Sequence, residues 1–236
     1  MIIPQQLFAG KPYTKALLAC LYLLLACLPI YGQTTLNVGG KTWIVPEFSS
    51  DTLTIKDRYF KEKSLLIANK FIKPLELSDG DFEARCYVKT ADLADRFIMI
   101  ILKENKHKLY AELYNCSYVA ILNDGTPGIK LGPYTSISVQ KNKRKVDLNQ
   151  DISFNKLIES GLFTYPDKTQ FDGGNTPDPA NEQYSDFVVE VKLNGKYHSF
   201  RYAPALLKAD QDNKKLLAGK TIINAFAVLG NFHRLI

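Results

Sequence analysis

The chain has 236 residues, of which 46% are hydrophobic and 23% charged, and its formal net charge is +6 at pH 7. This length allows one domain or two small ones, with ample material for a buried core. The modest positive charge is dispersed along most of the chain and does not indicate a nucleic-acid-binding protein.

Residues 1–32 have the pattern of a secretory signal peptide. A segment with two lysines and no acid precedes an apolar run at 16–30, and Gly32 follows as a small residue. The run is shorter than the roughly 20 residues of a membrane span. We therefore expect residues 1–32 to be removed. The mature chain would begin at Gln33, have no transmembrane span and be exported to the periplasm or the extracellular space.

A competing processing site lies at Cys27. Together with the preceding residues 24–26 it has the form of a bacterial lipobox, in which the cysteine is acylated and anchors the protein. The apolar run continues past this cysteine to Ile30, whereas a lipoprotein usually has a polar tether there. Cleavage after Gly32 is therefore favoured, and a lipoprotein anchored through Cys27 is the alternative.

Residues 33–236 predict a single, strand-rich α+β domain with a mostly antiparallel sheet. Apolar and polar residues alternate most clearly in the segments 81–90, 96–105 and 108–115. Turn chemistry predicts hairpins at Gly39-Gly40, Glu104–His107 and Asn194-Gly195. The apolar run within 58–77 fits either a helix or buried strands, and we favour strands.

Two helices are expected in the second half of the chain. Apolar spacing predicts a short helix at 152–160 and a C-terminal helix within 213–232 that packs on the sheet. Between them, the segment 165–183 contains three prolines, two glycines and almost no apolar residues. It predicts a long exposed loop, which could be a domain boundary.

The basic run 141–145 has two interpretations. It could bind lipid phosphates, acidic glycans or nucleic acid. It could also be the solvated tip of a hairpin between 135–140 and 146–148, as charged runs between strands usually are. We favour the hairpin tip, which predicts that Lys141, Lys143 and Lys145 are dispensable for folding.

Two cysteines, Cys86 and Cys116, remain in the mature chain and could form a disulfide in an oxidising compartment. Strand alternation places Cys86 with the core-facing residues of its segment. The same rule places Cys116 on the face opposite Leu109 and Leu113. A bend at Asn115 would be needed to bring the two thiols together.

A group of tyrosines is a weak candidate for a ligand-binding site. Tyr110, Glu112, Tyr114 and Tyr118 share one strand face, and Tyr87 lies on the matching face of its own strand. On an open sheet these rings could stack on sugars or on a partner protein. The favoured alternative is that a helix, most simply the C-terminal one, covers them as part of a second core.

No catalytic, cofactor-binding or metal-binding motif is found in the sequence. The Gly-Lys-Thr fragments at 40–42 and 219–221 lack the earlier glycine of a phosphate-binding loop. The segment that begins at Asp147 lacks the glycine and the glutamate of a calcium loop. The histidines are dispersed, and no G-x-S-x-G is present. We therefore predict no catalytic residue, no metal and no cofactor.

These features favour an exported, non-catalytic protein of the cell envelope or extracellular space. It would bind a glycan or another envelope protein through its sheet surface or the segment 165–183. The alternatives are a secreted hydrolase of cell-wall or other polysaccharides, since paired carboxylates need no local motif, and an inhibitor or immunity-type protein. A carboxylate-lined pocket would favour the hydrolase, whereas a flat aromatic surface would favour the binding protein.

Overall fold

The computed structural model describes residues 34–46, 60–89, 96–121, 127–128, 136–167, 186–204, 206 and 210–232. The chain divides into two units, Met1–Gln33 and Thr34–Ile236, and every described element belongs to the second unit. The predicted leader lies outside the described residues. In chain order the elements are β1 (Thr34–Val38), β2 (Lys41–Val45), α2 (Phe60–Ala68), η1 (Leu75–Leu77), β3 (Phe82–Lys89), β4 (Arg96–Asn105), β5 (Lys108–Ile121), β6 (Pro127–Gly128), β7 (Ser136–Lys145), α3 (Ser153–Glu159), β8 (Asp186–Leu193), β9 (Lys196–Tyr202) and α5 (Lys214–Gly230).

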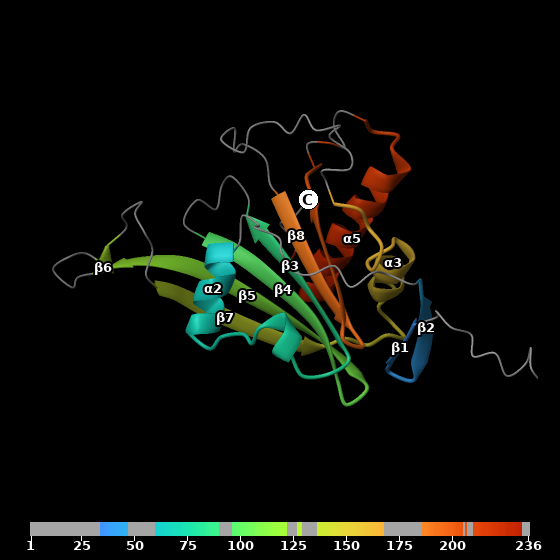
Figure 1. The fold of residues 1–236 in the computed structure, drawn as a ribbon, viewed down its shortest axis with the longest axis horizontal. Helices are drawn as coiled ribbons and strands as arrows, with labels where there is room; N and C mark the ends of the chain where they lie inside the picture. The colour runs from blue at the N-terminus through green and yellow to red at the C-terminus, as the bar shows by residue number, and fades with distance from the viewer. Residues whose placement is uncertain are drawn as a thin grey trace, which may run out of the picture. The chain divides into compact units, whose positions relative to one another are not determined.

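A seven-stranded antiparallel sheet forms the centre of the second unit (Figure 1). Its order is β6-β5-β4-β3-β8-β9, with β7 also paired to β5, while β1 and β2 form a separate two-stranded sheet. The strand-rich, mostly antiparallel α+β fold expected from the sequence is confirmed.

The predicted hairpins are also present. Lys106 and His107 connect β4 to β5, and Asn194 and Gly195 connect β8 to β9, all four with positive φ between 50° and 76°. Positive φ at both central residues matches the right-handed twist of the flanking strands.

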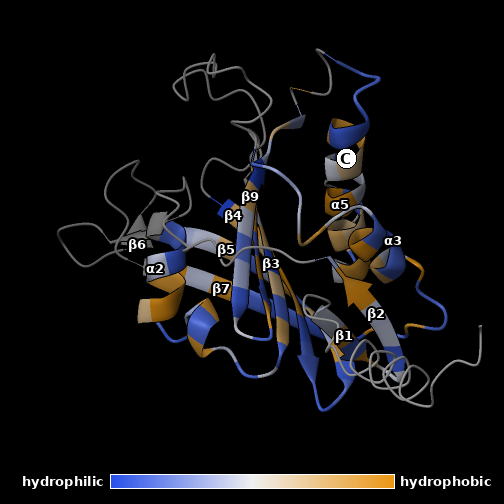
Figure 2. Cartoon of the chain, turned by 45° about the vertical axis from the view of Figure 1, so that its right-hand side comes forward, coloured by the Kyte–Doolittle hydropathy of each residue, from blue (hydrophilic) through white to orange (hydrophobic). Residues whose placement is uncertain are grey.

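One face of the sheet, here called the first face, is covered by α3, α5 and the β1–β2 hairpin. The residues at alternate positions of β3, β4 and β5 that point to this face are apolar and buried, among them Phe82, Cys86, Ile100 and Leu102. From α5, the same core contains Ile222, Ile223, Phe226 and Leu229. Figure 2 shows α3 and α5 together on this side of the sheet. The predicted C-terminal helix and its packing on the sheet are confirmed.

Gly219 lies within α5, although glycine has a low helix propensity, because the space around it admits no side chain. A Cβ at this position would collide with the hydroxyl of Tyr165 and with the ring of Tyr202. The glycine therefore lets the helix approach these two aromatic residues. Tyr165 itself is only 3% exposed, so the segment 165–183 begins inside the core, although its residues 168–183 lie outside the described part.

The preference for strands within 58–77 is wrong, because residues 60–68 form helix α2. The apolar run 65–67 is too short to distinguish a helix from a buried strand. Tertiary contacts decide between them. Leu66 is fully buried against the sheet face opposite α5, here called the second face, and Leu65 and Ile67 pack beside it. Figures 1 and 2 show α2 on the opposite side of the sheet from α5.

The interpretation of 141–145 as a hairpin tip is also wrong. These residues form the second half of β7, which pairs with β5 from Val119↔Ser136 to Tyr110↔Lys145. Among the described strands β7 pairs only with β5, so it lies at an edge, where charged residues are common because they discourage further strand pairing. The polar sequence of an edge strand thus resembles that of a turn.

None of the described helices combines the length and the apolar character needed to cross a membrane.

The packing of α5 generates a prediction for Phe226, which is 0% exposed. Replacing it with alanine should lower the free energy of unfolding by about 3–5 kcal/mol, because the deletion leaves a cavity between helix and sheet. Lys220→Ala, at an exposed position of the same helix, is the control. Chemical denaturation of the two variants and the parent measures the effect. Equal midpoints for Phe226→Ala and the parent would show that α5 is peripheral.

Candidate functional site

The second face of the sheet has two chemically different halves. Its apolar half packs beneath α2 and contains Tyr87, Phe97, Met99, Ile101, Tyr114, Cys116, Ile137 and Val188. Its charged half lies toward the other end of the same strands and contains Glu83, Arg85, Lys103, Glu112, Lys141, Lys143, Glu190 and Lys192. In this half, strand register sets Lys103 beside Glu83, and Glu190 beside Arg85.

The tyrosine group belongs mainly to the apolar half. Tyr87 and Tyr114 are 1% and 2% exposed, and Tyr110 and Tyr118 are half-buried. The hydroxyl of Tyr87 donates to Glu190 at 3.2 Å, and that of Tyr114 donates to Glu112 at 2.8 Å. Because these rings are packed in a second core, Tyr87 and Tyr114 offer no open surface for stacking on a sugar.

The helix that covers this face is α2, so the expectation that the C-terminal helix covers it is wrong. Two polar contacts hold α2 to the sheet, from Lys63 to Glu190 and from the Tyr118 hydroxyl to Glu62. Most of the buried apolar side chains of the C-terminal helix belong to the core of the first face, and none of its described residues belongs to the core of the second, so this helix does not cover the second.

The two cysteines lie on opposite faces of the sheet, and both are free thiols. Cys86 belongs to the core of the first face and Cys116 to the core of the second. Burial raises the pKa of the Cys86 thiol and raises that of Cys116 to about 12. Both thiols are therefore protonated near neutral pH, a state in which they are poor nucleophiles.

Glu112 is the centre of the charged half. It is 1% exposed, and Lys103 and Lys141 each place an ammonium nitrogen 2.9 Å from one of its carboxylate oxygens, with Lys143 at 3.7 Å. Burial alone would raise the pKa of this carboxyl, but hydrogen bonds from Lys141, Lys103 and Tyr114 outweigh it and lower the pKa to about 2. Glu112 is therefore an ionised structural anchor and is unsuited to donate a proton as a general acid.

Arg85 is the second buried ion of this half, at 1% exposure. Its Nε donates to Glu83 at 2.7 Å, and its Nη2 donates to the backbone carbonyl of Lys73 at 2.8 Å. Its remaining nitrogen, Nη1, is buried and has no hydrogen-bond partner among the described residues. An unsatisfied buried donor on a charged group is rare and calls for an explanation, such as an acceptor from a ligand, an ion or a water.

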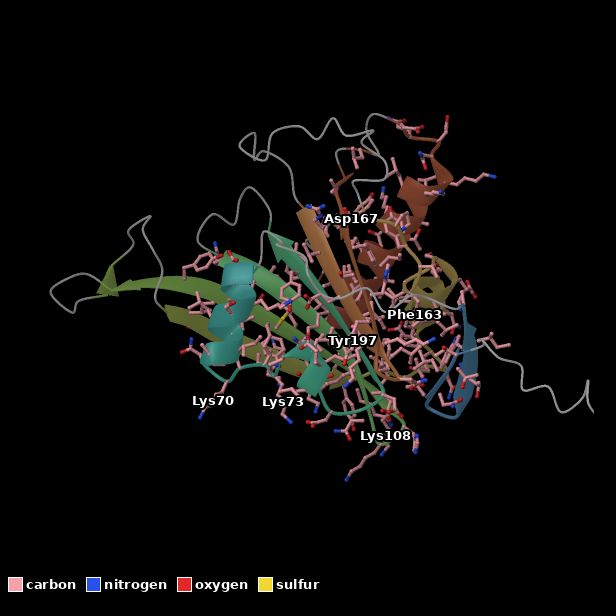
Figure 3. All side chains as sticks on the ribbon, in the orientation of Figure 1. Lys70, Lys73, Lys108, Phe163, Asp167 and Tyr197 are labelled. Carbon is pink, nitrogen blue, oxygen red and sulfur yellow. The ribbon has the colours of Figure 1, made fainter. Side chains whose placement is uncertain are left out.

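A cavity of about 250 Å³ lies between the charged half and residues 70–79, the segment that follows α2. Five cationic side chains line it, namely Lys70, Lys73, Arg85, Lys103 and Lys141, together with the carboxylates of Asp79, Glu83 and Glu104. Lys192 donates to the Ser78 carbonyl at 2.8 Å and so ties this segment to the sheet. Figure 3 shows Lys70 and Lys73 projecting from the segment at one edge of the molecule.

Sequence reasoning identified Glu112 but missed the cations around it. Lys141, Lys143 and Lys145 recur at every second residue, which is the period of a strand with one charged face. That spacing was the available signal for a charged strand. The place of Arg85 in this cavity could not be predicted from the neighbouring sequence, because the cavity is lined by distant segments and one partner of Arg85 is a backbone carbonyl.

Comparisons with protein-family models, with curated proteins and with solved structures give no match for this chain. Within the part of the chain that the structure describes, no three His, Cys, Asp or Glu side chains converge in a way that could hold a metal ion.

The environment of Glu112 predicts that Lys141 and Lys143 matter for folding, contrary to the expectation from a hairpin tip. The double substitution Lys141→Gln and Lys143→Gln leaves a buried carboxylate with Lys103 as its remaining cation. Because these lysines are 43% and 45% exposed, we expect a loss of about 1–2 kcal/mol, less than for a fully buried pair.

Urea denaturation at neutral pH measures this loss. Lys145→Gln is the control, since it removes one lysine charge from an exposed position of β7 that makes no ion pair with Glu112. If the double variant stays within about 0.5 kcal/mol of the parent, as ordinary surface substitutions do, the proposed anchoring role of these lysines is wrong.

Proposed function

We propose that this protein is an exported, non-catalytic binding protein that holds a glycan or another protein at the cavity beside residues 70–79. The observation that carries the proposal is the convergence of five cationic side chains on one cavity, from residues 70–73, β3, β4 and β7. A stable core alone would not require this arrangement, because buried ion pairs often contribute less to stability than well-packed apolar residues.

The rim of the cavity supports a ligand larger than a free metabolite. Phe71 is 40% exposed and lines the cavity, and Leu77 is 68% exposed in the same segment. Lys70 and Lys73 line the same cavity as Phe71. An exposed aromatic residue is a potential anchor for a macromolecule, because aromatic residues are enriched at protein interfaces and the rim of such interfaces is polar.

The carboxylates of the cavity give less support to a hydrolase. A glycosidase needs a carboxylic acid whose pKa is raised, so that it can donate a proton to the leaving group. Here a hydrogen bond from Lys73 lowers the pKa of Asp79, and Glu83 is paired with Arg85. Carboxylates held in this way are suited to position cations rather than to transfer protons.

Export rests on the leader pattern of residues 1–32. We place the mature chain in the periplasm or the extracellular space, with anchoring through Cys27 as the alternative form. Either form would present the charged half of the sheet to glycans and proteins of the cell envelope.

Site-specific photo-crosslinking in the native host tests the proposal. A photoreactive phenylalanine analogue at Phe71 should give an adduct with a glycan or protein, and the same analogue at Ile152, 60% exposed and next to α3, should not. The adduct should fall at least five-fold when Lys70 and Lys73 are both changed to Gln. No adduct at position 71, or equal adducts at both positions, would contradict the proposal.

A further inference from the structure

Arg85 supplies the first argument for the kind of group that the cavity binds. A guanidinium has five N–H donors in a fixed planar fork. In Arg85, Nε donates to Glu83 and Nη2 donates to the Lys73 carbonyl, while Nη1 lacks a hydrogen-bond partner among the described residues. A buried donor without an acceptor carries its full desolvation cost. An acceptor oxygen bound in this cavity could supply what Nη1 lacks.

Lys103 and Lys141 supply the second argument. Each ammonium group has three donors, and each of these two lysines reaches Glu112 at 2.9 Å with one carboxylate oxygen as partner. Both line the cavity, and their side chains are 27% and 43% exposed. Each therefore keeps donors that a ligand can use. Lys70, which is exposed, is a further cation of the lining.

The carboxylates of the cavity already have partners. Asp79 accepts from Lys73 at 2.9 Å, Glu83 accepts from Arg85, and Glu104 accepts from the backbone N–H of His107. Glu112, behind the lining, forms ion pairs with Lys103 and Lys141 and accepts a hydrogen bond from Tyr114 at Oε2, while its Oε1 has no hydrogen-bond partner among the described residues. An incoming cation would have to compete with these contacts, whereas an incoming anion would meet donors in surplus.

We propose that the cavity is an anion subsite that holds one carboxylate or phosphate group of the bound glycan or protein. This inference rests on the function proposed above and names the chemistry that the site recognises. The volume of about 250 Å³ lies below the usual range for drug-sized ligands, so it suits one charged group and its immediate attachment. Charge-assisted hydrogen bonds from arginine and lysine are the strongest available for such a group.

Titration of the ¹⁵N-labelled mature protein with three probes tests the subsite. Galacturonate supplies a carboxylate on a sugar, inorganic phosphate supplies the other anion, and galactose is the neutral sugar matched to the first. We expect saturable amide shifts at Lys70, Arg85 and Lys103 with at least one anion, in the millimolar range typical of a single small group. Galactose should leave these shifts unchanged. The stronger of the two anions identifies the chemical source of the group.

Three variants make the test specific. Lys70→Gln should weaken anion binding two- to five-fold without unfolding, since this lysine is exposed. Arg85→Lys should weaken it more than ten-fold, and its folding is checked by its own amide spectrum. Lys156→Gln removes the same charge from an exposed position on α3 and should bind like the parent.

The proposal is overturned if neither anion gives saturable shifts, if galactose acts equally, or if Lys70→Gln binds like the parent. Any of these results together with a specific adduct at position 71 would refute the anion subsite and leave the binding function standing. Loss of the adduct as well would refute both.

Discussion

The structure depends on one constraint: the central strands β3 and β8 are apolar along the whole of the first face but along only part of the second. On β3 the first face has Phe82, Ala84, Cys86 and Val88, whereas the second has Glu83 and Arg85 before Tyr87. The first face therefore needs a continuous cover, which α3, α5 and the β1–β2 hairpin provide. The second face has an apolar half, which packs beneath α2, and a charged half, which lies beside residues 70–79.

Helix α2 covers the apolar half of the second face. Its nine residues span roughly 14 Å, whereas the ten residues of β7 span roughly 33 Å, so the helix covers only part of the face. Lys63 and Glu62 fix it by contacts with Glu190 and Tyr118. The rest of the face remains beside residues 70–79, where the cavity lies. The candidate site thus lies beyond the reach of α2, where residues 70–79 and not a helix pack beside the charged half of the sheet.

Patterns within short stretches of sequence were sufficient to predict the strands and helices that those stretches themselves determine. Alternation and turn residues predicted β3, β4, β5 and the β8–β9 hairpin, and apolar spacing predicted α3 and α5. Helix α2 was missed because a three-residue apolar run takes its conformation from what it packs on. The second half of β7 was interpreted as a hairpin tip, because an edge strand can be almost wholly polar.

The candidate site was harder to predict than the fold, since its contacts join distant parts of the chain. Lys63 and Glu190 are 127 positions apart, and the Nη2 of Arg85 binds a backbone carbonyl that no sequence pattern reveals. The tyrosine face was identified correctly as a possible second core, but alternation does not tell which helix covers it. Its cover could be assigned only from the three-dimensional packing.

The charged half of the second face is organised around the ionised carboxylate of Glu112. A carboxyl whose pKa is lowered by folding contributes stability above its ordinary pKa of 4.5, and that contribution is lost as the pH falls toward about 2. The most direct measurement is a ¹³C NMR titration of the Glu112 side-chain carboxyl in the folded mature protein. The account predicts a midpoint near 2. A midpoint at or above the ordinary value of 4.5 would show that the lysines of β4 and β7 do not hold this carboxylate, and would contradict the account.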